Sequence, residues 1–226
     1  MTELPPPRRT YRPGGPQSIP RPEAWTALDD PAPAAHPLRV STDEVARVLE
    51  PTWTSRPLQP DFEGARLSAV LVVLADDADG QASVLLTRRS RLMRNHSGEI
   101  SFPGGRFDPG ENAVQAALRE AREEVGLSPR LVTVIGELDH LSLAVSGSYI
   151  VPIVARLPAP VELTPASNEV ERIMWVPLAE LVRADTFRAE RWGTATGQRV
   201  LHFFELEDET VWGITAFVLS DLLRRL

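Results

Sequence analysis

Two runs of apolar residues dominate the centre of the chain and give the first indication of its structure. Leu67–Ala75 and Ala82–Ser90 are rich in valine and leucine, and the turn-forming cluster Asp76–Gly80 separates them. This pattern predicts a β-hairpin at the start of a compact domain. Further strands are predicted at Leu131–Leu138, Ser148–Leu157, Arg172–Val176 and Arg199–Leu206.

Helical patterns alternate with these strands. Glu111–Val125 contains good helix formers and ends at Gly126, a residue suited to a helix C-terminus. Pro177–Val182 predicts a short helix, and apolar residues recur at helical spacing in Ile214–Leu226. Mixed strands with a central and a terminal helix predict an α/β sandwich.

The first quarter of the chain has a different composition. Thirteen of the 21 prolines lie between Pro5 and Pro60, and proline opposes regular structure because it lacks an N–H donor. Within this region Ser41 and Glu44 resemble a capping box, which predicts a short helix near residues 42–49. We therefore expect a proline-rich N-terminal arm at 1–62 and one domain at 63–226.

Composition narrows the class of protein. The chain has 226 residues, of which 42% are hydrophobic and 24% charged, as in ordinary globular proteins. It has no cysteine, and its net charge of −7 opposes a broad nucleic-acid surface. Its longest apolar run, Ala69–Ala75, is shorter than the ~20 residues of a membrane-spanning helix. Because Met1–Thr10 lacks the apolar stretch of a secretory signal, a cytoplasmic location is expected.

Three carboxylates gather on the predicted central helix. Glu120, Glu123 and Glu124 share one arc beside an apolar face, where like charges repel. A divalent cation holding a phosphate ligand would offset this repulsion. The alternative is a solvated face whose acids pair with Arg119 and Arg122. The glycines of the preceding loop favour a ligand, because they allow the backbone to approach it closely: Gly104, Gly105 and Gly110.

The same stretch resembles the Nudix box, G-x5-E-x7-R-E-U-x-E-E-x-G-U, at every specified position. The match runs from Gly105 through Glu111, Arg119 and Glu120 to Leu127. Upstream, Leu85–Gly105 resembles the signature LLTxR[SA]x3Rx3Gx3FPGG of the coenzyme A pyrophosphatase subfamily. The resemblance implies a Nudix α/β/α sandwich with a mixed sheet. It also implies metal-dependent cleavage of coenzyme A to 4′-phosphopantetheine and adenosine 3′,5′-bisphosphate.

Residue roles follow from the resemblance. It implies that Glu120 and Glu124 are the main ligands of Mg²⁺ or Mn²⁺, and that the Gly105 carbonyl is a backbone ligand. Glu123 is a third ligand or the general base, and Glu169, in the loop 164–170, is an equal candidate for the base. The implied structural residues are Glu111 and Arg119, as a pair between loop and helix, with Gly104 and Gly126.

Three arginines precede the box and suit phosphate binding, because a guanidinium can contact a phosphate with two nitrogens: Arg88, Arg89 and Arg94. One of them could recognise the 3′-phosphate of coenzyme A; surface solvation or ion pairing is the alternative for each.

Two other functions stay open at this point. One is a Nudix pyrophosphatase for another nucleoside diphosphate derivative, such as a dinucleotide or nucleotide sugar. The other is a catalytically silent module that binds a nucleotide. The expected partner is a small nucleotide substrate, with no nucleic acid and no membrane, and a homodimer could form through the arm or exposed strands.

Overall fold

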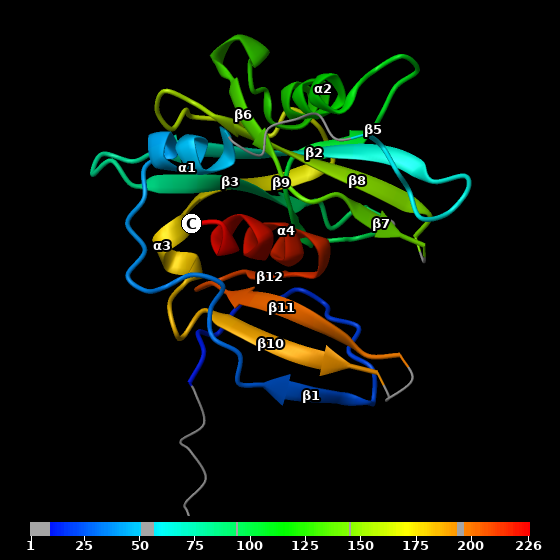
Figure 1. Ribbon diagram of the computed structural model, residues 1–226, viewed down its shortest axis with the longest axis vertical. Helices are drawn as coiled ribbons and strands as arrows, with labels where there is room; N and C mark the ends of the chain where they lie inside the picture. Colours follow the sequence, from blue (N-terminus) through cyan, green and yellow to red (C-terminus); the bar gives the residue numbers. More distant parts are fainter. Residues whose placement is uncertain (1–9, 51–56, 94, 145, 194–196) are drawn as a thin grey trace, which may run out of the picture.

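The computed structural model describes residues 10–50, 57–93, 95–144, 146–193 and 197–226, and Figure 1 shows their arrangement. Its elements, in chain order, are β1 (Trp25–Leu28), α1 (Thr42–Leu49), β2 (Arg66–Asp76), β3 (Ala82–Arg89), β4 (Ile100–Ser101), β5 (Gly104–Arg106), α2 (Ala113–Val125), the 3-10 turn η2 (Pro129–Leu131), β6 (Thr133–Glu137), β7 (Leu141–Leu143), β8 (Ser148–Arg156), β9 (Val170–Pro177), α3 (Leu178–Leu181), β10 (Phe187–Trp192), β11 (Arg199–Glu205), β12 (Thr210–Trp212) and α4 (Gly213–Arg224). All the predicted strands and helices are present, with ends shifted by a few residues.

A mixed sheet of eight strands forms the centre of the molecule. Its main path runs β4-β3-β2-β8-β6, while β5, β7 and β9 pair with β2, β8 and β3. The predicted hairpin is confirmed, because β2 and β3 pair antiparallel with Leu74 opposite Val84. The long pairing of β2 with β8 is parallel, which makes the sheet mixed.

Both faces of this sheet are buried, which explains why β2 is apolar at consecutive positions. Leu71 and Val73 belong to the cluster that includes Ala117 and Ala121 of α2. The alternate residue Val72 belongs to the cluster beneath α1 and α4. Because successive side chains of a strand point to opposite faces, helices cover the sheet on two sides. The expected α/β/α sandwich is therefore the observed fold (Figure 1).

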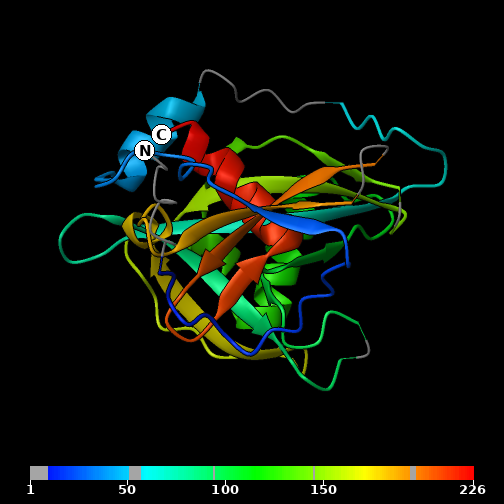
Figure 2. The same ribbon diagram turned by 90° about the horizontal axis from the view of Figure 1, so that it is seen from below.

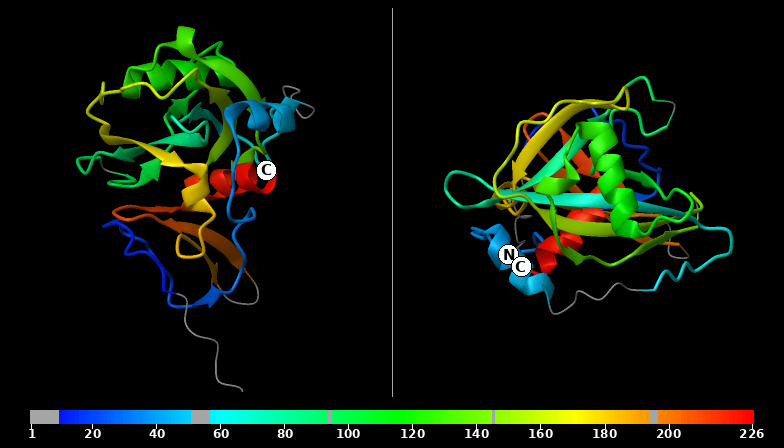
Figure 3. Two further views of the ribbon diagram at one scale, coloured as in Figure 1. Left: turned by 90° about the vertical axis from the view of Figure 1, so that its left-hand side faces the viewer. Right: turned by 90° about the horizontal axis from the view of Figure 1, so that it is seen from above.

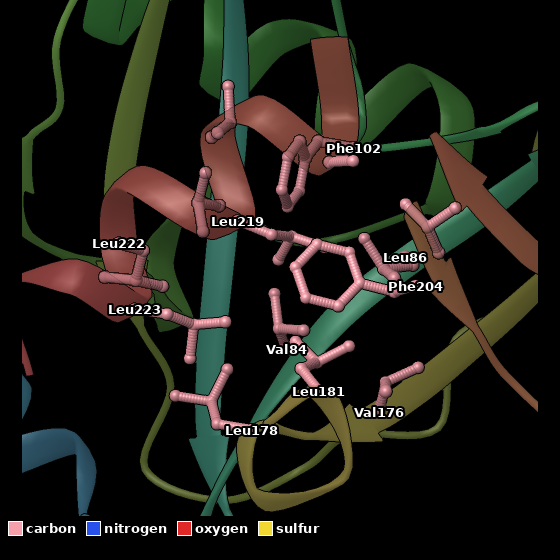
Figure 4. Packing of buried hydrophobic residues seen from close by; sticks show 14 of the residues in the cluster. Val84, Leu86, Phe102, Val176, Leu178, Leu181, Phe204, Leu219, Leu222 and Leu223 are labelled. Atoms are coloured by element: carbon pink, nitrogen blue, oxygen red, sulfur yellow. The ribbon is translucent and has the colours of Figure 1, made fainter. Parts of the chain in front are cut away.

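A second sheet, which the sequence patterns did not predict, adds a further layer. Its strand order is β1-β10-β11-β12, and α4 lies between it and the central sheet (Figure 3). Figure 4 shows Leu219 and Leu222 of α4 in the same packed cluster as Phe204 of β11. These three side chains are fully buried, so the two sheets share one core through α4.

The described part of residues 1–62 packs on the domain, whereas an arm was expected. β1 pairs antiparallel with β10, with Thr26 opposite Arg191. The predicted helix is α1, capped by reciprocal bonds between Ser41 and Glu44, and its Val45 is fully buried. The proline content of this region therefore gave no information about how the region packs on the domain. Among the described residues no helix is long and apolar enough to cross a membrane.

Candidate active site

The central helix is fixed at both ends and lies beside the glycine loop. Asn112 caps α2 in a capping box with Gln115, so the helix begins slightly later than predicted, and Gly126 closes it in the left-handed conformation, φ 71°. The loop passes through β5, where Gly105 pairs with Ala69 of β2. A Cβ at Gly105 would lie 2.3 Å from Glu120 Oε1. Only glycine therefore leaves room for the Glu120 carboxylate against this backbone.

Glu124 is the most deeply buried acid of the helix, at 6% exposure. Its Oε2 accepts a hydrogen bond of 3.2 Å from the Gly104 backbone N–H. The pKa of Glu124 is raised to about 7, chiefly by burial; the Gly104 bond and Arg89 oppose the rise, and the negative charges of Glu120 and Glu169 add to it. A carboxylate is therefore kept where its ionised form is disfavoured.

Glu120 shows the same tendency in a weaker form. Burial raises its pKa, the hydrogen bond from Arg119 lowers it, and the charges of Glu123 and Glu169 raise it again. The charge of Glu169 raises the pKa of both Glu120 and Glu124, and that of Glu120 raises the pKa of Glu124, so these carboxylates lie near one another. Together they form a locally negative site beside the glycine loop.

Arg119 connects the loop to this acidic cluster. Its Nε and Nη2 contact the two Glu111 oxygens at 2.9 and 3.1 Å, which lowers the pKa of Glu111. Its Nη1 contacts Glu120 at 2.9 Å and Glu123 at 3.2 Å. The pair between Glu111 and Arg119 is thus present, and the same guanidinium also holds two acids of the helix.

Arg89, at the end of β3, and Glu169, in the turn just before β9, complete the region. Arg89 Nη2 lies 3.5 Å from Glu169 Oε2, and the Ser90 N–H donates to the Glu169 carbonyl at 2.7 Å. The Nε of Arg89 is buried without a hydrogen-bond partner in the described structure. Because Arg89 also acts electrostatically on Glu124, its guanidinium lies beside the acids and not at a remote surface.

The donor set fits a hard divalent cation. Carboxylate and carbonyl oxygens are the ligands that Mg²⁺ and Mn²⁺ accept, and the raised pKa values of Glu120 and Glu124 reflect negative charge and burial that a cation would compensate. Within the described ranges, no three acidic or histidine side chains already converge as a metal-holding set. Two of the helix acids are instead turned toward Arg119.

Arg88 lies away from this cluster. Its Nη1 contacts the fully buried Glu209 at 2.6 Å, and its Nη2 contacts Glu171 at 3.1 Å. β-strand alternation explains the difference, since Arg88 and Arg89 point to opposite sides of β3. Both terminal nitrogens of Arg88 are therefore engaged in ion pairs, the alternative that the sequence had left open. Arg94 lies outside the described residues.

Some contacts of the site carried no local signal in the sequence. The Ala166 N–H donates to the Glu124 carbonyl at 2.9 Å, which ties the loop before β9 to the end of α2. This bond brings the loop that contains Glu169 next to the helix acids. Only the family resemblance had pointed to this loop, since residues 40 positions apart in the chain share no periodicity.

Comparison with protein families gives one match, to the family model described as NUDIX domain, over residues 65–195, more than half of the chain. An uncharacterized Nudix hydrolase, NudL, from Photorhabdus laumondii is 37% identical over 145 residues, covering 63% of this chain and 76% of the relative. Its namesake from Klebsiella pneumoniae is 34% identical over 158 residues, covering 70% and 81%. The mitochondrial Nudix hydrolase 15 of Arabidopsis thaliana is 32% identical over 167 residues, covering 71% of this chain and 58% of the plant protein.

Solved structures are similar over about half of the chain. The Nudix hydrolase RenU of M. smegmatis superposes with a TM-score of 0.46 at 24% identity, covering 56% of this chain and 82% of that one. An Ap4A hydrolase from C. elegans gives a TM-score of 0.44 at 25% identity, covering 52% and 85%.

Proposed function

This chain belongs to the Nudix hydrolase family, and from this premise we propose that it cleaves the diphosphate bond of coenzyme A. The products are 4′-phosphopantetheine and adenosine 3′,5′-bisphosphate. A small-molecule substrate is thus its principal partner, and the cytoplasmic location and a homodimer are proposed with it.

One observation carries this proposal. The segment that resembles the coenzyme A pyrophosphatase signature begins in β3 and ends in β5, and near both ends it reaches the acidic cluster, since Gly104 donates to Glu124 at 3.2 Å. Arg89, one of its signature residues, lies 3.5 Å from Glu169 and acts on Glu124. The motif that suggests the substrate and the carboxylates that suggest the chemistry therefore share one site.

The chemistry assigned to the chain follows from its charges. Glu120, Glu124 and the Gly105 carbonyl hold Mg²⁺ or Mn²⁺, with Glu123 as a further ligand. When bound, such ions neutralise the diphosphate, lower the pKa of a water and orient its attack. Arg89 adds a positive charge on the same side of the sheet, where it can bind a phosphate oxygen of the substrate.

The geometry favours Glu169 over Glu123 as the general base. Both side chains are half exposed, but Glu123 is held by Arg119 at 3.2 Å, whereas Glu169 lies 3.5 Å from Arg89. The charges of both acids act on Glu120, but only that of Glu169 also acts on Glu124. Proton removal by a positioned group contributes about 10²–10⁴-fold to rate. Glu169→Gln is expected to lower kcat by that factor with little change in thermal stability, and Glu123→Gln by much less. Normal turnover in both variants would remove the assignment.

Arg89 and Arg94 remain the proposed phosphate-binding residues, with different expected targets. Arg89 borders the metal-binding acids, so Arg89→Ala should raise KM for coenzyme A and for dephospho-coenzyme A alike. If Arg94 recognises the 3′-phosphate, Arg94→Ala should raise KM for coenzyme A alone. Equal effects of Arg94→Ala on both substrates would contradict that role.

The decisive experiment incubates the purified protein with coenzyme A and Mg²⁺ beside a Glu124→Gln control. Mass analysis should show both products with the wild type and neither with the control. Cleavage of dinucleotides or nucleotide sugars without cleavage of coenzyme A would transfer the proposal to those substrates. Calorimetric binding without any hydrolysis would indicate a silent nucleotide-binding module instead.

A further inference from the structure

The N-terminal segment, residues 10–21, is held against the second sheet by backbone contacts. The Gly14 N–H donates to the Leu206 carbonyl at 3.1 Å, and the Gly15 N–H donates to Thr210 Oγ1 at 3.0 Å. A Cβ at Gly15 would lie 2.4 Å from the Glu209 Cα, so the two backbones touch here. The segment therefore has a fixed path, which Figure 2 shows beneath the domain in dark blue.

Gln17 uses both ends of its side-chain amide in this position. Its Oε1 accepts from the Thr210 N–H at 2.8 Å. Its Nε2 donates to Glu209 Oε2 at 2.6 Å and to the Gly98 carbonyl at 3.1 Å. An amide nitrogen has two hydrogens, so one is available for each of these acceptors.

The acceptor on the sheet side is strongly held. Glu209 is fully buried, and its Oε1 contacts Arg88 at 2.6 Å and Arg172 at 2.8 Å. Charge-assisted bonds of this kind are shorter and stronger than neutral ones. Glu209 thus gives Gln17 a rigid support, from which its amide reaches across to Gly98.

Gly98 lies in the loop between β3 and β4, whose two ends join the active site. At one end the Ser90 N–H donates to the Glu169 carbonyl at 2.7 Å, and at the other the Glu99 carbonyl accepts from the Arg89 N–H at 2.9 Å. The middle of the loop is exposed at Arg91 and Leu92. Gln17 therefore holds the loop at a third point, through the Gly98 carbonyl.

From these contacts we infer that Gln17 is a positioning residue of the active site. It fixes Gly98 and the adjacent Glu99, whose carbonyl accepts from the Arg89 N–H at 2.9 Å, and so supports the position of Arg89 in the substrate site. Substrate affinity then depends on a segment outside the NUDIX match at 65–195. The expected change in KM rests on the proposed function, whereas the anchoring of the loop by Gln17 does not.

Two variants and one matched control test this role in the full chain. Gln17→Ala removes the amide, whereas Gln17→Glu keeps its size but removes both donors and faces Glu209 with a like charge. Gln81→Ala, in an exposed turn where Nε2 bonds only the Asp79 carbonyl among the described residues, is the control. Both Gln17 variants should raise KM for coenzyme A about tenfold, ~1.4 kcal/mol, with kcat unchanged within about twofold, and the control should change neither.

Hydrogen exchange supplies a readout that does not need activity. In both Gln17 variants the amides of residues 95–99 should exchange faster, while those of α2 and β8 keep the wild-type rates. Unchanged KM and unchanged exchange at 95–99 would overturn the inference, as would faster exchange spread over the whole chain. If the wild type leaves coenzyme A intact, the proposed function fails, and local exchange alone then decides whether Gln17 anchors the loop.

Discussion

Replacing Glu124 by glutamine should stabilise the metal-free protein at high pH and leave it nearly unchanged at low pH. Glutamine keeps the shape of the side chain and an oxygen that can accept the Gly104 N–H, now at 3.2 Å. It removes the negative charge whose burial raises the pKa of Glu124 to about 7. The substitution therefore isolates the free energy of ionising this group inside the protein.

The sign and magnitude follow from proton linkage. The pKa is about 7 in the folded state and 4.5 as the reference value, so the folded protein holds a proton that the unfolded chain releases between these pH values. The stability that this bound proton contributes is fully present below pH 4.5 and is lost as the pH rises through 7. A difference of about 2.5 units corresponds to about 3 kcal/mol, most of which develops between pH 5 and pH 8.

The assay is urea unfolding followed by the fluorescence of the five tryptophans, in EDTA at pH 5 and at pH 8. The advantage of Glu124→Gln over the wild type should grow by about 2.5 kcal/mol between the two pH values. Glu63→Gln, at an exposed turn, is the matched control and should give the same small difference at both. With saturating Mg²⁺ at pH 8 most of this advantage should disappear, because an ion at 100 times its Kd stabilises the wild type by about 2.7 kcal/mol. A pH-independent difference in EDTA would refute the reasoning.

Four further substitutions test the surroundings of the acids. Gly105→Ala should abolish most activity with little loss of stability, because its Cβ would displace only the flexible end of Glu120. In Gly104→Ala the Cβ would meet the backbone of β2 at 2.4 Å, which should cost about 1–3 kcal/mol in urea unfolding. Equal stability losses in the two variants would contradict this contrast. Gly126→Ala should cost about 1 kcal/mol, since φ is 71° at this helix end, and an unchanged Tm would argue against the cap. Arg119→Lys should lower Tm, because the ammonium of lysine cannot contact both oxygens of Glu111 as the guanidinium does. The loss of Tm should be smaller when Mn²⁺ is added. An equal loss with and without the ion would contradict the role of the guanidinium in holding the helix acids.

Local patterns predicted the elements that are governed by local forces. The hairpin of β2 and β3 follows from its apolar runs and turn, and the ends of α2 follow from Asn112 and Gly126. β10 was missed because its sequence, FRAERW, has three charged residues in six and no β-branched residue. Its Glu190 is nevertheless buried, since it contacts Arg21 from the N-terminal segment at 2.6 Å. That partner lies far away in the chain, so no pattern within the strand could indicate it.

The same distinction applies to the site. The box predicted which acids lie together on α2, because helical spacing is local. It could not predict the partners of Arg88 and Arg89, because Glu209 and Glu169 lie in turns that are far away in the chain. Gln17 is a stronger case, as its contacts join residues 81 and 192 positions away in the chain.

The distribution of positive charge around α2 sets Glu124 apart from the other acids of the site. If the helix acids were only a solvated face, they should pair with the neighbouring arginines, and Glu111, Glu120 and Glu123 do contact Arg119. Glu124 is different: among the described residues no arginine forms a salt bridge with it, although it is the most buried of the four. An uncompensated buried carboxylate lowers stability, and leucine or glutamine at that position would remove the cost. The presence of glutamate at position 124, where burial disfavours its charge, is therefore best explained by a ligand that binds the carboxylate.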